Sequence, residues 1–523
     1  MARLLQYLCK LHIMKIFLCF ILLLVYNVMM AQDVNDSSLK SSDTTSLKIT
    51  YTSNAGNPDK IRTKNITIYD SSVDNGPHNK YGDLLNDDPA YNKKYPVWTP
   101  ASRVILSNVF LWSVDRFVLN ADFANISPAS WKENLRAGFE WDNDHFGTNF
   151  IGHPYSGNNY FNIARSNGYN FWQSFPFAVG GSLMWEYFGE NSHPSKNDII
   201  NTPVSGAFLG EILYRVSSNI LDDRATGANR VFREFIAGIL NPTRAFNRLT
   251  QGKMFRVTNK EVYQKEPLNI TIFTGIHKVN DNNKFGTGET NYTFNLQLDY
   301  GDPFEVRHRK PFDVFRFRTE SSFGATKKIL GTATGYGLLF GKNIIKGENA
   351  TLIGGFQSFD YWNNKIFELG AIGLGVGIIS RIPILKISEL YSSIHFAAVP
   401  LAANNTSFGP DTSRFRDYNF GGGLESKIEE TLNLKLITLG FNAYYYWLQN
   451  YENLKGTSSI GILRPRIILN FSKYIGLGLE QQVYFVNRNL KDNTTSTLHL
   501  TRTEQKLFLQ IFLEDPKRKG KYH

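Results

Sequence analysis

The residue types that carry acid–base chemistry are densest between positions 152 and 215 of this 523-residue chain. Glu186 and Glu190 are four residues apart, so their carboxylates would share one face of a helix. Two carboxylates can divide the acid and base roles of a hydrolase when their surroundings separate their pKa values. His153 could act as a base toward a serine hydroxyl, and Asp198 is the fourth candidate catalytic group.

A structural role explains the same residues, and we favour it. Ionisable clusters have shifted pKa values in structural networks as well as in active sites. The polar cluster expected to form such a network comprises Tyr155, Asn158, Asn159, Asn197, Asn201, Glu211 and Arg215. Within it, Glu211 and Arg215 have the i,i+4 spacing of a helical ion pair. We therefore assign no catalytic residue, and enzymatic activity stays an open alternative.

Motifs for nucleophilic or metal chemistry are absent from the sequence. It contains neither a Gly-x-Ser-x-Gly elbow nor a His-Glu-x-x-His zinc motif. His145, His153 and His193, taken with Glu186, have no spacing that defines a ligand geometry. The sequence therefore predicts neither a metal nor a cofactor.

The stretch from Gly152 to Glu211 carries a family resemblance in the order and spacing of its residues. It reads GHPYSGNNYFNIARSNGYNFWQSFPFAVGGSLMWEYFGENSHPSKNDIINTPVSGAFLGE, and it resembles the bacterial family called domain of unknown function 3943. Weaker similarities follow at Asp360-Tyr-Trp-Asn363 and Asp417-Tyr-Asn419. The resemblance implies an exported envelope protein without an assigned activity.

Residues 1–31 have the pattern of a signal peptide. Three basic residues precede an apolar run over residues 16–26, and Ala31 is a small residue at a suitable cleavage point. An uncleaved membrane anchor is the alternative, although the run is shorter than the ~20 residues needed to span a bilayer. Both cysteines, Cys9 and Cys19, would leave with this segment, and the formal charge would fall from +11 to +8 because three basic residues are removed.

The rest of the chain divides by composition and periodicity. Residues 32–98 are polar and aperiodic, which predicts a disordered leader. Residues 99–255 have a helical pattern, and residues 262–515 alternate with a period of two. The basic tail, residues 516–523, suits anionic lipid head groups rather than nucleic acid, since no basic–aromatic nucleic-acid motif accompanies it.

Capping and proline signals predict where the helices begin. Thr99-Pro100, Ser127-Pro128 and Thr202-Pro203 each place a capping residue before a proline at the first helical position. Ser195 with Asp198 three residues later is similar to a capping box. Gly206 and Gly210 have the spacing that lets another backbone approach a helix closely.

Twelve segments of the last region alternate as strands of a membrane-spanning barrel do. In one of them Tyr292, Phe294 and Leu296 alternate with polar residues, and aromatic residues stand at the ends of such apolar faces. The segments begin near residues 268, 290, 311, 326, 350, 366, 386, 416, 433, 457, 475 and 496. Asn-, Gly- and Asp-rich turns separate them, and an even count suits a closed antiparallel barrel.

The other parity of these strands carries charge and would face the lumen. The expected lumen charges are Arg316, Arg318, Glu320, Arg464, Arg466, Arg502 and Glu504. If the helices fill the lumen, these arginines could neutralise Glu186 and Glu190. Gly373, Gly375 and Gly377 share one parity, which favours close approach of the helix that contains Gly206 and Gly210; kinks where the barrel curves are the alternative.

The resulting hypothesis is an α+β protein, in which a transmembrane antiparallel β-barrel of about twelve strands follows an N-terminal helical domain that plugs or caps the lumen. It predicts an outer-membrane protein that contacts outer-membrane lipid, binds no nucleic acid, and has a structural, binding or transport role. The sequence defines neither the small-molecule or glycan ligand nor the oligomeric state. Two alternatives remain: a membrane-embedded hydrolase acting on lipid or cell-wall glycan, and a soluble periplasmic β-sandwich with a helical domain.

Overall fold

The computed structural model describes residues 77–324, 330–364, 366–385, 388–405, 418–451, 455–490 and 497–515. The predicted signal peptide, the basic tail and most of the predicted leader therefore lie outside the described residues. The described residues divide into two units, residues 77–79 with 84–86, and residues 80–83 with 87–515. In the first unit, His78 pairs with Leu84 in an antiparallel bridge.

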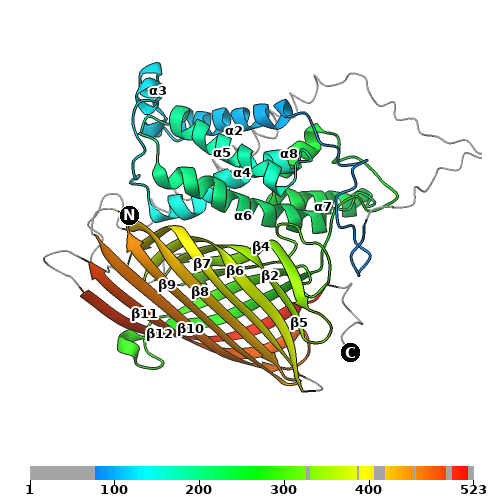
Figure 1. Ribbon diagram of the computed structural model, residues 1–523, viewed down its shortest axis with the longest axis vertical. Helices are drawn as coiled ribbons and strands as arrows, with labels where there is room; N and C mark the ends of the chain where they lie inside the picture. Colours follow the sequence, from blue (N-terminus) through cyan, green and yellow to red (C-terminus); the bar gives the residue numbers. More distant parts are fainter. Residues whose placement is uncertain are drawn as a thin grey trace, which may run out of the picture. The chain divides into compact units, whose positions relative to one another are not determined.

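The helices of the second unit precede its strands. They are α2 (Trp98–Phe117), α3 (Pro128–Asn134), α4 (His153–Arg165), α5 (Phe171–Phe188), α6 (Lys196–Ile220), α7 (Gly227–Leu240) and α8 (Pro242–Thr250), with the short helices η1 (Asp122–Ala124) and η2 (Thr148–Gly152) between them. Figure 1 shows α2, α5, α4 and α6 stacked in layers. Over the described part of the chain, no helix is both long enough and apolar enough to cross a membrane.

The strands form a closed antiparallel barrel. They are β1 (Leu268–Val279), β2 (Thr290–Tyr300), β3 (Phe315–Phe323), β4 (Leu330–Ile345), β5 (Ala350–Asn363), β6 (Glu368–Leu385), β7 (Ser388–Asn405), β8 (Asn419–Asn433), β9 (Ile437–Asn450), β10 (Gly456–Asn470), β11 (Ile475–Leu490) and β12 (Thr497–Leu513), and η3 (Asp281–Asn283) lies after β1. Each strand pairs with the next, and β1 closes the circle against β12. The predicted twelve-stranded barrel is confirmed, with strand starts wrong by four residues at most, as at β3 (311 predicted, Phe315 observed).

The period of two separates the inner wall of the barrel from its outer wall. On β3, Arg316 and Arg318 point inward, because both reach Glu429 on β8, five strands away in the barrel order. Phe315 and Phe317 alternate with these arginines along the strand and therefore point outward. Inner and outer faces of the other strands follow from the same pairing register.

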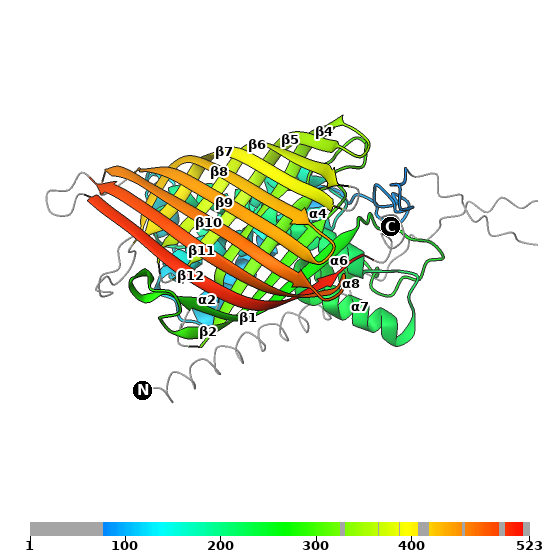
Figure 2. The same cartoon turned by 90° about the horizontal axis from the view of Figure 1, so that it is seen from below.

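The helices pack on the outer wall, which corrects the expectation that they plug or cap the lumen. Phe208 of α6 contacts the rings of Phe317 and Phe359 at centroid distances of 6.4 and 5.9 Å. Phe359 precedes Asp360, which points inward to bind Lys427 of β8. Both partners of Phe208 are thus outward residues, and in Figure 2 the helices lie behind the strands. The physical reason is that the barrel's own charged side chains occupy the lumen.

The glycine pairing between helix and barrel was also predicted wrongly. A Cβ on Gly206 would lie within 3.0 Å of backbone atoms of Gly157 and Asn158, so α6 approaches α4 at this point. On β6, Gly373 and Gly377 face inward, where a Cβ would meet Glu425 and His395 respectively. The glycines of α6 do allow another backbone to approach closely, as predicted, but that backbone belongs to α4 and not to the barrel. Gly157 and Gly206 both lack a side chain, so the two helices can meet there.

Only one of the three predicted proline starts is correct. Ser127 and Ser130 form a reciprocal capping box with Pro128 at the start of α3. In contrast, α2 begins at Trp98 without a side-chain cap, and Pro203 lies inside α6. Ser195 occupies the N-cap position of α6, yet its side chain makes no capping bond. The buried packing of α6 outweighs the cost of a proline that cannot donate a backbone hydrogen bond.

Candidate functional site

His153 lies at the centre of a buried group of carboxylates in the helical block. It is the first residue of α4, and its Nε2 lies 3.3 Å from Oδ1 of Asp198 in the first turn of α6. The same nitrogen lies 3.7 Å from Oδ2 of Asp144, whose side chain is 52% exposed. Thr202 Oγ1 is 3.3 Å from the other ring nitrogen, Nδ1. The imidazole is therefore held from two helices and one loop, with a single half-exposed carboxylate beside it.

Asparagine amides fix the loop that carries Asp142 and Asp144. The Nδ2 of Asn197 donates to Asp142 Oδ2 at 2.8 Å and to Asn149 Oδ1 at 2.9 Å. Asn149 in turn donates to Asp142 Oδ1 at 3.0 Å and to the Tyr418 hydroxyl, which precedes β8, at 2.6 Å. The group around His153 is thus anchored to the barrel as well as to α6.

Glu186 and Glu190 do not share a helical face as predicted, because α5 ends at Phe188. The carboxylate of Glu186 accepts the backbone N–H of Ser195, the N-cap residue of α6, at 2.7 Å. Burial, with the charge of Glu190 next, raises the pKa of Glu186 to about 8. Burial and then Asp198 raise the pKa of Glu190 to about 8 as well. Both carboxylates thus favour the protonated form.

The same electrostatics keep His153 protonated at neutral pH. Burial alone would lower its pKa, but Asp198 and Asp144, with Glu186 and Asp142 behind them, raise the pKa to about 10. We call these six residues, Asp142, Asp144, His153, Glu186, Glu190 and Asp198, the histidine–carboxylate cluster. An imidazolium cannot accept a proton, so His153 is not a general base at neutral pH.

Part of this cluster has the spacing of metal ligands. One ligand atom from each of Asp142, Asp144 and His153 lies within 4.8 Å of the other two. Carboxylate oxygen and neutral imidazole nitrogen are the donors that divalent transition metals use in proteins. Binding would require His153 to lose its proton. The sequence pointed to His145 and His193 as well, but His193 lies elsewhere, against Glu133 and Glu140.

The predicted polar cluster divides into separate networks. Glu211 accepts two hydrogen bonds from Arg165, at 2.7 and 3.0 Å, and its i,i+4 ion pair with Arg215 is confirmed at 2.8 Å. Arg215 also reaches Asp313, in the β2–β3 connection, at 3.2 Å. Burial opposes ionisation of Glu211, but the two guanidinium groups hold its pKa below the usual range. This network joins the helices to the barrel and contacts no cavity residue.

The remaining predicted polar residues lie between helices or at the surface. Asn158 accepts from Asn162 at 2.7 Å, and Asn159 accepts from Thr243 at 2.9 Å. Asn201 accepts from the Ser205 hydroxyl at 2.6 Å. Tyr155 is largely exposed. These contacts are structural, and sequence spacing alone did not separate them from the histidine–carboxylate cluster.

Ion pairs cross the lumen of the barrel. Glu429 of β8 binds Arg318 and, at 2.7 Å, Arg316. Arg318 also donates to the Tyr444 hydroxyl of β9 at 2.9 Å, and β3 and β9 are diametrically opposite in a ring of twelve strands. Glu320 of β3 binds Lys506 of β12. These bonds connect facing walls, which the strand-by-strand pattern could not predict.

The other predicted lumen charges have local partners. Arg464 pairs with Glu480 at 2.9 Å, and Glu504 accepts from His277 at 2.7 Å. The guanidinium of Arg466 lies 5.7 Å from the ring centre of Phe273, and Arg502 donates to the carbonyl of Thr501 at 3.3 Å. Lys506 was expected on the charged face of the last strand, whereas Glu429, Tyr444, Glu480 and Lys427 were not expected, since their importance depends on strands that are distant along the chain.

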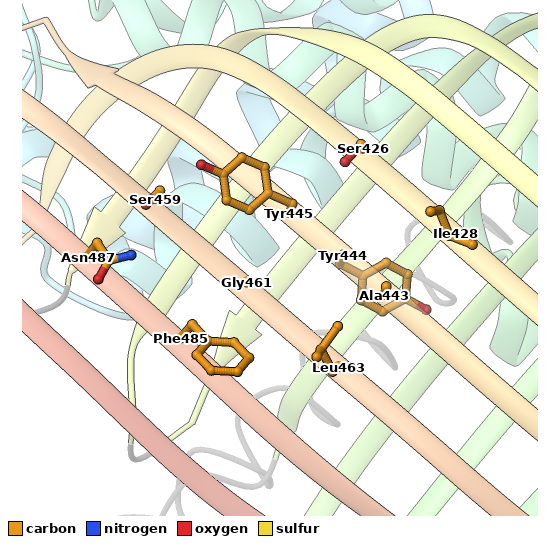
Figure 3. Close-up of a pocket in the computed structure, with 10 residues that line it drawn as sticks. All are labelled: Ser426, Ile428, Ala443, Tyr444, Tyr445, Ser459, Gly461, Leu463, Phe485 and Asn487. Carbon is orange, nitrogen blue, oxygen red and sulfur yellow. The ribbon is translucent and has the colours of Figure 1, made fainter.

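Two hollows of different size lie in the barrel. A cavity of about 30 Å³ is lined by inward residues that include Arg318, Arg464 and Lys506. A water molecule needs roughly 10–15 Å³ of such space, so this cavity has room for about two or three. A larger depression of about 380 Å³ lies on the outer wall, where Tyr445 and Phe485 flank Gly461 (Figure 3). Its lining is mainly apolar.

Comparisons with known proteins agree with the family resemblance. Residues 138–243 match the family described as Domain of unknown function (DUF3943), which confirms the resemblance seen in the sequence. No curated protein sequence matches the chain.

Solved structures of similar fold are porins and channels. The NanC porin is 10% identical over 46% of this chain and 98% of its own, with a TM-score of 0.25. OmpT of Vibrio cholerae is 7% identical over 47% of this chain and 96% of its own, with a TM-score of 0.23. An anion-selective porin from Comamonas acidovorans is 8% identical over 47% of this chain and 98% of its own, with a TM-score of 0.21. These scores are too low to carry an argument about function, and the barrel assignment rests on the strand pairing.

Proposed function

We propose that this protein resides in the outer membrane, where its barrel is a closed, non-conducting scaffold that carries the helical domain. The outward side chains of β9, including Leu439, Phe441 and Trp447, are apolar and each about 40% exposed. Except for β3, the strands have eleven or more residues, which meets the 9–11 needed to cross a bilayer. An apolar outer wall of this kind would be unfavourable in water and is suited to lipid.

The observation that carries the closed scaffold is the set of bonds across the lumen. Arg318 contacts Glu429 and Tyr444 from the opposite wall, and charged groups in low dielectric are held strongly when paired. A solute-conducting pore needs a continuous aqueous path, and the lumen cavity of about 30 Å³ is far smaller than one. The helical domain is then the part that binds other envelope components.

We expect the protein to remain in the membrane fraction when isolated membranes are extracted with alkali. Its release should require detergent. Reconstituted in planar bilayers, it should show no steady conductance steps, because the cross-lumen pairs block the path. Fractionation with soluble periplasmic proteins would contradict the membrane location. Stable single-channel steps from the unmodified protein would contradict the closed lumen.

A second candidate function is a membrane-embedded hydrolase acting on lipid or glycan. The contact that favours it is the 3.3 Å approach of His153 to Asp198. The hydroxyl on the other side of the imidazole belongs to Thr202, which is 3% exposed, so substrate could not reach it. The raised pKa of His153 also removes the general base at neutral pH. A structural role for the histidine–carboxylate cluster therefore has more support.

His153→Ala distinguishes these functions through its pH dependence. The folded pKa of about 10 exceeds the usual 6.5, so the charged imidazole stabilises the fold fully below about pH 6.5, and this stabilisation is lost as the pH rises through 10. At 1.36 kcal/mol per pKa unit, H153A should lower the free energy of unfolding by on the order of 4 kcal/mol at pH 6. The difference from the unmodified protein should shrink towards pH 10–11.

The control for this substitution is His145→Ala, since His145 is exposed. Thermal unfolding of both variants across pH 6–11 provides the measurement. A folded H153A protein of unchanged stability that loses hydrolysis of a lipid or glycan substrate would support the hydrolase instead.

A further inference from the structure

The helical block buries many polar side chains beside an apolar core that includes Phe161 and Ile212, and it also exposes many apolar side chains. Asn108 of α2 is buried and donates to the carbonyl of Gly181 at 3.0 Å, and Asn162 of α4 is fully buried. The hydroxyl of Ser182 is buried against the carbonyl of Asp198. Water-soluble bundles place polar residues on the surface and apolar residues in the core. A bundle that exposes apolar side chains to this extent needs a surrounding medium other than water.

The outer side of α2 is uncharged and apolar over three turns. Ile105, Leu106 and Val109 are 51%, 47% and 51% exposed. Residues 104–114 contain no charged side chain. The charges that flank this stretch turn inward: Asp115 is buried, and the guanidinium of Arg103 donates to Thr250 at 3.0 Å.

The outer side of α5 continues this surface. Residues 171–185 are uncharged. Trp172, Pro176 and Gly180 are exposed at four-residue intervals, which places them on one face of the helix. Contiguous exposed apolar surface of this kind marks an interaction site for a membrane or another protein.

The position of the block against the barrel identifies the medium. Phe208 of α6 covers outward residues of β3 and β5, Phe317 and Phe359. Farther round the same wall, Leu439 and Leu477 point outward and are about half exposed. If lipid covers the outer wall at Leu439 and Leu477, the helical block takes the position of lipid at β3 and β5. Figure 1 shows the helices along one side of the barrel, and in Figure 2 most of them lie behind its strands.

We propose that the outer faces of α2 and α5 contact the acyl chains of the membrane, so that the helical block lies within the lipid layer beside the barrel. This inference rests on the proposed membrane location of the barrel. A helix in this position meets lipid on one side only, and its other side can be polar because it packs on α4 and α6. Amphipathic α7 also exposes an apolar face, since Val231, Phe232, Phe235 and Ile239 are all more than half exposed.

Nitroxide labels on single cysteines test this placement. The full chain, with Cys9 and Cys19 replaced by serine, receives Leu106→Cys or Val109→Cys on α2 and is reconstituted in phospholipid vesicles. Collision of the label with oxygen reports lipid, and collision with a water-soluble nickel chelate reports water. Leu439→Cys on the outer wall and Lys346→Cys, exposed in the turn after β4, are the lipid and water references.

We expect the labels at 106 and 109 to match the label at 439, with oxygen accessibility high and nickel accessibility low. A water-like label at 106 and 109 with a lipid-like label at 439 overturns the inference and leaves the proposed function intact. A water-like label at 439 refutes the membrane location itself. Low accessibility to both reagents at 106 and 109 shows a protein contact, which also overturns lipid contact.

Discussion

Glu429→Ala should open the barrel lumen and destabilise the barrel. The substitution leaves the guanidinium groups of Arg316 and Arg318 facing each other without the carboxylate that joins them, and the Tyr444 hydroxyl loses its acceptor. Removing one partner of a buried ion pair costs about 3–5 kcal/mol, because the other charge is left uncompensated. The repelling arginines should also draw in water along the widened path.

Two measurements check this expectation. The temperature at which the barrel loses its heat-modifiable gel mobility should fall for E429A, and conductance should appear in planar bilayers where the unmodified protein shows none. Glu430→Ala is the matched control. Glu430 is the next residue on β8, points away from the lumen, and accepts a hydrogen bond from the Ser392 hydroxyl at 2.7 Å. If E429A is as stable and as non-conducting as E430A, the cross-lumen pairs do not close the barrel.

Gly206→Ala should disrupt the helical block. A Cβ at this position would lie within 3.0 Å of three backbone atoms, two in Gly157 and one in Asn158. No side chain can rotate away to make room, so α4 and α6 must separate, and the buried polar contacts between them, such as Asn162 to the Gly210 carbonyl at 3.0 Å, must stretch. Overpacking of a tight core costs about 1–3 kcal/mol and more where the backbone must move.

The matched control is Gly180→Ala on α5, where a Cβ would meet nothing within 4 Å. That substitution should stabilise the helix by up to about 1 kcal/mol, since alanine has the higher helix propensity. Limited proteolysis of the folded protein in detergent micelles gives the comparison: G206A should be cut within residues 153–220 at protease concentrations that leave G180A intact. Equal resistance would mean that the close α4–α6 approach contributes nothing to stability.

The strand pattern was predictable because it depends on local environment. Each strand has one side toward lipid and one toward the lumen, so apolar and polar residues alternate along the sequence whatever the partner strand is. On β3 this parity alone placed Arg316 and Arg318 on the inner wall. Helix starts were less predictable, since Pro203 fits a first helical turn locally, yet tertiary packing extends α6 seven residues before it to Lys196.

The candidate site was predictable only in part. His153 and Asp198 stood out by residue type, and the structure places them 3.3 Å apart. Asp142 and Asp144 were missed, because their loop carries no motif and reaches His153 only after Asn149 and Asn197 hold it. Glu190 fell outside α5, so the expected shared face with Glu186 did not form.

By itself, the sequence determined the class of the protein: a helical domain followed by twelve alternating strands with a charged inner face. Only the tertiary structure decided on which side of the barrel wall the helices lie. Aromatic residues on a helix are equally compatible with either side, and the choice depends on Phe208 meeting the outward Phe317 and Phe359 while the inward charges pair with one another. Those contacts join residues more than sixty positions apart, beyond what any local periodicity encodes.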